Sequence, residues 1–384
     1  MLRLASKIVS EVMLKKRSLR DALYERRLPT GKLRLLKKLT FETIKRRNEI
    51  EYRLKYVGVR KSLFYNAVAY TARVLGIIER GPRKVEEALR LELEEIASGE
   101  LLESLKYRHP IRMIKLFKRI LGDEAYELMN ANNTPSPIRF RVNRLKADEG
   151  VLKRLKSKGI EFEEDEEFPG VYKTRDRRIF ETEERKKRLI ITQDKSSQSV
   201  LTLFSGGFVV DACAAPGTKT QGLAERCDDV IAIDMDAKRV RRMRRLLELY
   251  NARVHIIAAD SMYLHKLFSR RFDGVLVDAP CSNLGSIRDM PEIKRLMKPS
   301  KPRVLSKVQK AILRSAVRIS DYVVYSTCTV TRIENEEVVK EIADEEGLEV
   351  ITPFKNRRGF GIGSRFRPHK DDTHGFFVAI LRRS

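Results

Sequence analysis

Two cysteine motifs lie about fifty residues apart, each at the end of an apolar run. The motifs are Asp278–Cys281 and Ser326–Thr329. Both runs are short, rich in β-branched or aromatic residues and flanked by turn formers, which is typical of buried strands in a parallel sheet. Ligands of such sheets gather at the carboxyl ends of the strands. We therefore expect the thiols of Cys281 and Cys328 to line one crevice, where they are candidates for covalent catalysis.

A loop of small residues is expected to follow an earlier strand of the same sheet. The loop and its flanks comprise Asp211, Ala212, Cys213, Ala214, Ala215, Pro216, Gly217, Thr218, Lys219 and Thr220. Small residues let the backbone approach a ligand, and the helix that follows offers free N–H groups to a carboxylate or a phosphate. The glycine spacing is that of neither the dinucleotide fingerprint nor the Walker phosphate loop.

Aspartates stand at the ends of three successive expected strands, at Asp211, Asp234 and Asp260. After the second strand, Asp234 is placed to accept hydrogen bonds from both hydroxyls of a ribose. After the third strand, Asp260 is placed to accept from an adenine amino group. For any one of these carboxylates alone, helix N-capping is the better explanation. The three together favour a nucleoside pocket.

Regions of different sequence pattern must position these residues. Up to about residue 128, apolar residues recur with helical periodicity, as in Leu63–Ile78 and Ile114–Leu121. Helix breakers cluster in Ala131–Pro137 and mark a boundary. From Ile138 to about Arg188, a strand, a basic helix and a second strand predict a small α+β unit.

Further along the chain, expected strands and helices alternate. The expected strands are 208–211, 230–234, 254–259, 274–278, 322–326 and 375–381. Such alternation predicts a doubly wound α/β sheet. The sequence therefore predicts an all-helical domain over 1–130, a small α+β domain over 138–190 and a doubly wound domain over 191–384. The acidic run 161–167 is expected to be a solvated edge without chemistry.

The chain of 384 residues carries 79 basic and 53 acidic side chains, a net charge of +26. Residues 1–50 concentrate this excess, with 15 basic and 5 acidic side chains. The balance favours a polyanionic partner, nucleic acid first, and a charge-rich, heat-adapted surface is a compatible alternative. The four cysteines form no disulfide framework and have no zinc-ligand spacing. No apolar run reaches the ~20 residues of a membrane span, so we expect a cytoplasmic protein without a metal.

The motifs together resemble those of one enzyme family. The stretch 211–220, Asp278–Cys281, Tyr325–Thr329 and Glu334–Glu336 are similar to the Nol1/Nop2/Sun family of RNA cytosine-C5 methyltransferases. The resemblance extends to Arg141–Asn143, Gln193–Asp194, Arg367–Lys370 and Gly375–Phe377. It covers 138–384 and implies a Rossmann-like methyltransferase sheet. It also implies S-adenosylmethionine as methyl donor, with a binding set of Cys213, Ala214, Ala215, Pro216, Gly217, Thr218, Lys219, Asp234, Asp260 and Asp278.

The resemblance also implies how the cysteines divide the work. Cytosine C5 becomes nucleophilic only after a thiolate adds to C6. The attacking thiol of the family lies in the Ser-Thr-Cys motif and maps to Cys328, and Cys281 then assists breakdown of the adduct. DNA cytosine methyltransferases attack with the Pro-Cys cysteine, so a nucleophilic Cys281 would indicate a DNA substrate. The alternative role, a small buried hydrophobe, we favour for Cys213 and Cys227 only.

Two other side chains are candidates for the chemistry. Asp278 is placed to bond the N3 and N4 edge of cytosine and to stabilise charge that builds during attack, although it is also placed to cap a strand end. Lys219 would favour the thiolate electrostatically, or would be an ordinary surface lysine. Pro280 and Gly285 are expected to shape the loop rather than react.

The helical region resembles, through Leu39–Ile50, the NusB-type RNA-binding domain of bacterial 16S rRNA methyltransferases in this family, and the α+β unit resembles an RNA-recognition fold. Thr218 and Arg295 depart from the family pattern, which usually has glycine and tryptophan there. The expected substrate is structured RNA with an extruded cytosine, ribosomal RNA first and transfer RNA next. A non-catalytic ribosome-assembly factor is the alternative. The oligomeric state is not predicted.

Overall fold

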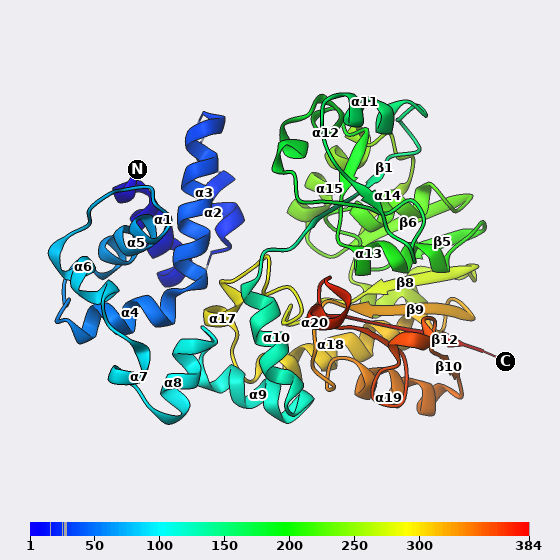
Figure 1. Ribbon diagram of the computed structural model, residues 1–384. Coiled ribbons are helices and arrows are strands. Elements are labelled where there is room, and N and C mark those ends of the chain that lie inside the picture. Colours follow the sequence, from blue (N-terminus) through cyan, green and yellow to red (C-terminus); the bar gives the residue numbers. More distant parts are fainter. Residues whose placement is uncertain (16, 25, 27–28, 384) are drawn as a thin grey trace. The chain divides into compact units, whose positions relative to one another are not determined.

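The computed structural model describes residues 1–15, 17–24, 26 and 29–383 (Figure 1). They divide into two compact units. Unit 1 comprises Met1–Pro135 and Ser286–Pro299, and unit 2 comprises Ser136–Gly285 and Ser300–Ser384. Within the described part of the chain, no helix has the length and apolar character that a membrane span requires.

Unit 1 is built from helices. They are α1 (Leu2–Leu14), α2 (Leu19–Tyr24), α3 (Thr30–Lys45), α4 (Arg47–Tyr56), α5 (Leu63–Val74), α6 (Arg83–Leu89), α7 (Leu93–Ile96), α8 (Gly99–Lys106), α9 (Ile111–Leu121), α10 (Glu124–Asn133) and α17 (Ile293–Leu296). The first core joins α1, α3 and α5 through buried aliphatic residues such as Ile8, Leu39 and Val68. On α9, Met113, Ile114 and Phe117 are buried, as the helical period predicts.

The segment 286–299 lies far along the chain from the other residues of unit 1 but packs among them. Arg288 donates from Nε to Thr134 O and from Nη2 to Pro135 O, each over 2.9 Å. Lys294 is buried and donates to Asn133 Oδ1 over 2.8 Å. Burial depresses the pKa of Lys294 well below its usual range. This segment is therefore part of the helical core, although it interrupts the sequence of the doubly wound region.

A four-stranded antiparallel sheet opens unit 2, in the order β2-β3-β1-β4. Its elements are β1 (Ile138–Val142), α11 (Val151–Ser157), β2 (Glu163–Glu164), β3 (Tyr172–Thr174), η1 (Arg177–Glu181), α12 (Glu183–Lys186) and β4 (Ile190–Thr192). Phe140 of β1 packs on Leu155 of α11 and on Ile160. The small α+β unit expected from the sequence is thus present.

The second sheet of unit 2 is mostly parallel and runs β10-β12-β9-β8-β5-β6-β7, with β11 paired to β12 (Figure 1). The β5–β9 strands pair in parallel, and β12 is antiparallel to β9. Its strands are β5 (Phe208–Asp211), β6 (Asp229–Asp234), β7 (His255–Ala258), β8 (Gly274–Asp278), β9 (Tyr322–Thr327), β10 (Glu349–Ile351), β11 (Ser364–Phe366) and β12 (Phe376–Arg382). The doubly wound sheet predicted from the alternating pattern is confirmed, and all six expected strands are found.

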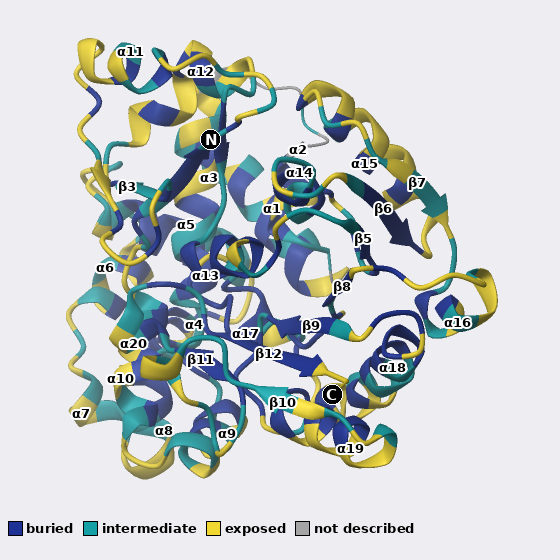
Figure 2. Cartoon of the chain, turned by 90° about the vertical axis from the view of Figure 1, so that its right-hand side faces the viewer, coloured by how far each residue is buried: buried dark blue, intermediate teal, exposed yellow. Residues whose placement is uncertain are grey.

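Helices cover both faces of this sheet. They are α13 (Lys195–Ser199), η2 (Val200–Leu203), α14 (Thr218–Ala224), α15 (Ala237–Leu249), η3 (Ser261–Tyr263), α16 (Leu264–Leu267), α18 (Lys301–Ala316), α19 (Glu336–Glu346), η4 (Lys355–Arg357) and α20 (Pro368–Asp371). One face packs on α18 and α19, and the other packs on η2, α14 and α15. The central strands are buried on both sides, as Figure 2 shows for β8, β9 and β12. This explains their continuous apolar sequences.

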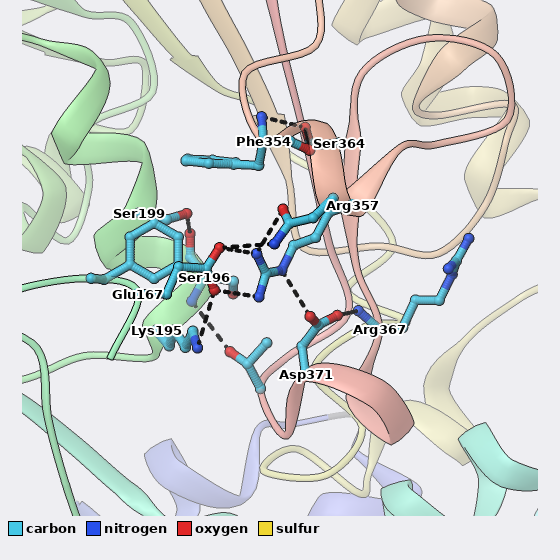
Figure 3. Close-up of polar contacts among 12 residues, drawn as sticks. Glu167, Lys195, Ser196, Ser199, Phe354, Arg357, Ser364, Arg367 and Asp371 are labelled. Atoms are coloured by element: carbon cyan, nitrogen blue, oxygen red, sulfur yellow. Dashed lines mark hydrogen bonds and ion pairs between the residues drawn. The ribbon is translucent and has the colours of Figure 1, made fainter. Parts of the chain in front are cut away.

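Most of the acidic run 161–167 is exposed, and Glu163 and Glu164 form the edge strand β2, as expected, but two of its carboxylates have charged partners. Asp165 is buried and pairs with Lys195 Nζ over 2.9 Å. Glu167 pairs with the guanidinium of Arg357, whose Nε also lies 2.7 Å from Asp371 Oδ1 (Figure 3). These ion pairs connect the small α+β unit to α13 and to the segment that precedes β12, so Asp165 and Glu167 have a structural role.

Candidate active site

The two thiols expected in one crevice lie side by side. Cys281 follows β8, Cys328 follows β9, and their Sγ atoms are 3.3 Å apart. Both thiols also contact Asn283 Oδ1, over 3.3 Å from Cys281 and 2.9 Å from Cys328. Because β8 and β9 are adjacent parallel strands, their carboxyl ends bring the two motifs together.

The two cysteines have different proton affinities. The hydrogen bond from Cys281, assisted by the positive charge of Lys219, lowers the pKa of Cys328 despite its burial. The same bond, together with burial and the nearby charge of Glu334, raises the pKa of Cys281 well above its usual range. At Cys328 burial and the carboxylate of Asp278 oppose the lowering, and the hydrogen bond from Cys281 outweighs them with the help of Lys219. The arrangement therefore favours a thiolate at Cys328 and a thiol at Cys281.

Asp278 and Lys219 form an ion pair beside the thiols. Lys219 Nζ lies 2.7 Å from Asp278 Oδ2, and only 14% of the lysine side chain is exposed. Ser326 donates its hydroxyl proton to Asp278 Oδ1 over 2.9 Å. The carboxylate raises the pKa of Lys219 although burial alone would lower it. Lys219 is therefore a buried cation of the site and not a surface lysine.

Backbone contacts lock the loop that carries Cys281. Gly285 donates from N to Cys328 O over 3.0 Å and accepts from Gly375 N over 2.9 Å. A Cβ atom at Gly285 would fall 1.8 Å from Gly375 O, so no side chain fits there. Gly285 thus joins both thiol loops to the start of β12, which agrees with the loop-shaping role expected for it.

At β5, the carboxylate of Asp211 is buried next to the loop of small residues. Thr220 donates to its Oδ2 over 2.7 Å, whereas Oδ1 has no hydrogen-bond partner among the described residues. Burial raises the pKa of Asp211 to about 7. An unsatisfied buried acceptor is costly and rare in proteins. This end of β5 therefore suits a ligand that brings a cationic donor.

The aspartates after β6 and β7 already have partners. Asp234 accepts from Ala215 N (3.3 Å) and Asp236 N (3.1 Å), and Arg239 Nη2 lies 3.1 Å from its Oδ2. Asp260 accepts from the backbone N of Met262 over 3.0 Å, which is an N-cap contact. The capping alternative is thus observed for Asp260, whereas Asp236 and not Asp234 caps the helix after β6. Asp234 Oδ1 has one donor and retains a second lone pair.

A motif of the small α+β unit anchors α14, the helix that follows the small-residue loop. Arg141 of β1 pairs with Glu225 Oε2 over 2.8 Å and donates to Thr218 O over 3.1 Å. Asn143 accepts from Gln221 Nε2 over 2.8 Å. Both charged side chains of the Arg141–Glu225 pair are nearly buried. The position of the loop therefore depends on contacts with the neighbouring domain.

The structure collects the predicted site residues in two groups along the strand ends. Cys281, Cys328, Asp278 and Lys219 form one group, and the small-residue loop with Asp234 forms the other. The two groups are linked electrostatically, because the charge of Asp278 raises the pKa of Asp211 and that of Lys219 lowers it. The sequence analysis did not identify Asn283. In the structure Asn283 has a left-handed φ of 61°, a conformation that asparagine tolerates, so its residue type was the only local indication.

The remaining cysteines lie outside the thiol pair. Cys213 is half-buried against the sheet core, and Cys227 is half-buried against the opposite core. Burial raises the pKa of Cys213 above its usual range and that of Cys227 to about 11. Both thiols therefore remain protonated at neutral pH. Among the described residues, no cluster of His, Cys, Asp and Glu has the arrangement of a metal site.

The order of the sheet, with antiparallel β12 between β9 and β10, defines a Rossmann-like methyltransferase fold. A structure of PH0851 superposes on the whole chain with a TM-score of 0.83 at 23% identity and is covered over 99% of its length. A methyltransferase homologue from Pyrococcus horikoshii matches 75% of this chain and 100% of its own, with a TM-score of 0.64 and 25% identity.

Sequence comparison narrows the class. Residues 198–382 match the family described as 16S rRNA methyltransferase RsmB/F, and 109–171 match the ferredoxin-like domain of RsmF/B-like methyltransferases. The probable ribosomal RNA small subunit methyltransferase B of Bacillus subtilis is 32% identical over 72% of this chain and 66% of its own length. The methyltransferase B of Pasteurella multocida is 29% identical over 91% and 84%. The chain belongs to the RsmB/F methyltransferases of the Nol1/Nop2/Sun family, as its motifs indicated.

Members of this family use S-adenosylmethionine, and the residues present here fit that cofactor. The orphaned Oδ1 of Asp211 suits the ammonium group of its methionine part. The carboxylate of Asp234 retains acceptor capacity for ribose hydroxyls at the expected strand end. The hydrogen-bonding groups at the ends of β5 and β6 thus match those of the cofactor.

Proposed function

We propose that this protein methylates C5 of a cytosine in structured RNA, through a covalent bond between Cys328 and C6 of the base. The observation that carries the proposal is the thiol pair, with its 3.3 Å separation and its opposite proton affinities. A protein that only binds RNA has no need of two thiols polarised against each other. S-adenosylmethionine, when bound, supplies an electrophilic methyl group.

In the first step Cys328 acts as the nucleophile. Its Sγ bonds to C6, and the electron pair of the C5–C6 double bond becomes available at C5. Lys219 stabilises the thiolate electrostatically before attack, because its ammonium group is buried with Asp278 beside the sulfur. Asp278 is left with acceptor capacity for the N4 amino group of the base, which would favour cytosine over uracil.

In the last step the adduct breaks down. The C5 proton passes to water, its bonding pair re-forms the C5–C6 double bond, and the C6–Sγ pair returns to Cys328. Cys281 keeps its proton because the hydrogen bond to Cys328 and burial raise its pKa, so its thiol stabilises the departing thiolate through that hydrogen bond. This assignment gives the two cysteines separate roles: Cys281 is required for breakdown of the adduct, whereas in its formation Cys281 only assists, through the hydrogen bond that lowers the pKa of Cys328.

The surface of the catalytic unit supports a polyanionic substrate. Helix α15 carries six exposed basic residues, and Figure 2 shows it as a largely exposed helix. They are Lys238, Arg239, Arg241, Arg242, Arg244 and Arg245. Several lie three or four positions apart, where like charges repel and destabilise the helix. The last four have no ion-pair partner among the described residues, so phosphate groups of RNA would offset their repulsion.

The two homologues described above are named as ribosomal RNA methyltransferases. Their names support ribosomal RNA as the first candidate substrate, with transfer RNA second. We also propose that the helical domain over 1–130 is an NusB-like RNA-binding domain and that 138–190 assists it. The net charge of +10 within residues 1–50 supports phosphate contacts there. A ribosomal RNA substrate also supports the expectation that the protein is cytoplasmic.

The test is to trap the adduct. The Cys281→Ala variant is incubated with total cellular RNA and S-adenosylmethionine, and protein–RNA adducts that survive denaturation are isolated and their RNA sequenced. We expect adducts at one cytosine of ribosomal RNA. The Cys281→Ala, Cys328→Ala double variant should form none, and a Cys227→Ala variant, which alters another half-buried thiol of unit 2, should behave as the wild type.

Each alternative has its own outcome. Adducts between DNA and a Cys328→Ala variant, which keeps Cys281, would indicate a DNA methyltransferase. Absence of any adduct, with folded protein that still binds S-adenosylmethionine, would favour a non-catalytic assembly factor. Adducts on transfer RNA alone would reverse the order of the two RNA candidates.

A further inference from the structure

Glu334 is a completely buried carboxylate to which none of the steps above assigns a part. It receives hydrogen bonds from uncharged donors, and no basic side chain pairs with it among the residues that the structure describes. The donors are Ser282 N (2.7 Å), Ser282 Oγ (2.6 Å), Thr331 Oγ1 (2.7 Å), Thr329 Oγ1 (3.3 Å) and Gln309 Nε2 (3.3 Å). A buried charge without a counter-ion is costly, and these bonds have to offset that cost.

The donors belong to the two thiol loops. Ser282 follows Cys281, Thr329 follows Cys328, and the hydroxyls of Ser282 and Thr329 are themselves 2.7 Å apart. Gln309 of α18 reaches the same loop from outside, since its Nε2 also donates to Pro280 O over 2.8 Å. One carboxylate thus bonds the residue next to each sulfur.

The neighbours of Glu334 hold the surrounding backbone. Asn335 accepts from Thr327 Oγ1 over 2.5 Å and donates to Thr329 O over 3.1 Å. Glu336 pairs with Arg365 of β11 through two bonds of 2.5 and 2.6 Å. Of the three side chains, that of Glu334 is the one that bonds both the Cys281 loop and the Cys328 loop.

We propose that Glu334 is a positioning residue that holds the Cys281 thiol against Cys328 for breakdown of the adduct. This rests on the function proposed above. Breakdown needs the thiol near the sulfur that leaves C6, which the bonds from Glu334 to Ser282 secure. Formation of the adduct depends on Cys328, Asp278 and Lys219, whose side chains Glu334 does not touch.

The charge of Glu334 gives the role a separate signature. After the hydrogen bond with Cys328 and burial, the negative charge of Glu334 also raises the pKa of Cys281. Removal of that charge lowers the pKa of Cys281. Any pH dependence of adduct breakdown that follows this thiol should therefore move to lower pH in a variant that lacks the charge. A purely structural defect would not move it.

The experiment uses Glu334→Gln, which keeps the shape and most of the hydrogen bonds but removes the charge. Adduct formation and breakdown are followed separately in single-turnover assays with the RNA identified by trapping. We expect breakdown to slow by about tenfold or more, so that the adduct accumulates. Formation of the adduct and binding of S-adenosylmethionine should stay within about twofold of the wild type.

A double-mutant cycle with Cys281→Ala tests whether Glu334 acts on breakdown of the adduct through the Cys281 thiol. In that background Glu334→Gln should slow breakdown by less than about twofold, because the thiol that it positions is absent. Equal slowing in both backgrounds, or slower formation without accumulation, would overturn the proposal. The control Glu336→Gln breaks the neighbouring ion pair with Arg365 and should lower the melting temperature without accumulation of the adduct.

A second variant tests the proposal independently in case Glu334→Gln does not fold. Ser282→Ala removes the hydroxyl donor and keeps the backbone bond from Ser282 to Glu334. It should accumulate the adduct in the same sense and to a smaller degree, and an unchanged breakdown rate would contradict the proposal. If Cys281→Ala itself traps no adduct, the proposed function fails. If it traps adduct and the Glu334 and Ser282 variants do not, only the positioning role fails.

Discussion

The thiol end of the site, around β8 and β9, and the cofactor end, around β5 to β7, are built differently. At the thiol end the polar groups are buried and bonded to one another, as with Cys281, Cys328 and the Asp278–Lys219 pair. At the cofactor end Asp211 has an orphaned oxygen, and Asp234 shares an oxygen with the half-exposed Arg239. The chain thus completes the groups for covalent chemistry on folding and leaves the ligand contacts to be made on binding.

Loss of the nucleophile should have the largest effect. Cys328→Ala is expected to reduce methyl transfer by at least about 10⁴-fold, because no other thiol in the pair is activated. S-adenosylmethionine binding, measured by calorimetry, should be unchanged, since the cofactor end is separate. Retained activity in Cys328→Ala that is lost in Cys281→Ala would reverse the assignment of the two thiols.

The orphaned carboxylate should make stability depend on pH. Burial raises the pKa of Asp211 to about 7, above its unfolded value, so the unfolded state ionises first as the pH rises. The stability present at about pH 4 is then lost as the pH passes through 7, by at most about 4 kcal/mol. Asp211→Asn removes this dependence of stability on pH, because an amide does not ionise.

Urea unfolding of cofactor-free protein tests the point. The stability of Asp211→Asn relative to the wild type should grow between about pH 4 and pH 8. A difference that is constant across this range would show that Asp211 ionises at its ordinary pKa, and that the cofactor end is as well satisfied as the thiol end.

Within the thiol end, Lys219→Met should lower the rate of adduct formation by about a hundredfold at neutral pH. The hydrogen bond from Cys281 is the first cause that lowers the pKa of Cys328, and the charge of Lys219 adds to it. Without this charge the pKa of Cys328 rises, so the rate profile should move to higher pH. An unshifted profile would mean that the lysine serves only the carboxylate of Asp278.

Helix α15 begins at the cofactor end, and its arginines should matter for RNA rather than for chemistry. Replacement of Arg241, Arg242 and Arg245 by Ala should raise KM for RNA by about tenfold at physiological salt. The slope of log affinity against log salt should become shallower by about 0.7 to 0.9 per arginine. The variant should also melt slightly higher, because like charges are removed.

A matched control exists on the opposite face of the sheet. Arg314 and Arg318 are also half-exposed or nearly so, but they pair with Glu345 and Glu346. Replacement of both by Ala should leave KM and the salt slope unchanged. Equal effects of the two sets would mean that the general charge of the protein, and not α15, holds the RNA.

The smallest effect is expected at Arg239. Arg239→Ala frees one oxygen of Asp234, and half-exposed ion pairs contribute little stability. We expect S-adenosylmethionine to bind up to about fivefold more tightly, with unchanged kcat. Weaker binding would show that Arg239 belongs to the cofactor site.

The sequence predicted the sheet and the thiol pair because both depend on local pattern. Apolar runs fix the strands, and parallel strands place the residues that follow them at one edge. It did not predict Asn283 between the thiols or the bonds to Glu334, because these join loops that only the tertiary fold brings together. The ion pairs of Asp165 and Glu167 could not be predicted for the same reason. The sequence of a charged run does not show whether its side chains face water or a basic residue far along the chain.

The segment 286–299 follows the same lesson on a larger scale. Its apolar residues Ile287, Ile293 and Met297 are as buried as those of the doubly wound region, so burial could be expected from their type. The core that they enter could not be predicted, since a sequence pattern identifies an apolar face but not the element against which that face packs. The boundary at Ala131–Pro137 was visible because prolines stop helices irrespective of tertiary contacts.

That segment also constrains how the protein is made. Domains generally fold as units while the ribosome is still adding residues, the N-terminal one first. Unit 1 contains Ser286–Pro299, so its helices cannot bury their last partners until more than three-quarters of the chain has been synthesised. Four of the eight strands of the catalytic sheet, β5 to β8, are then already translated, so the two units complete their folding late and close together. Neither can be released by a single cut in the chain.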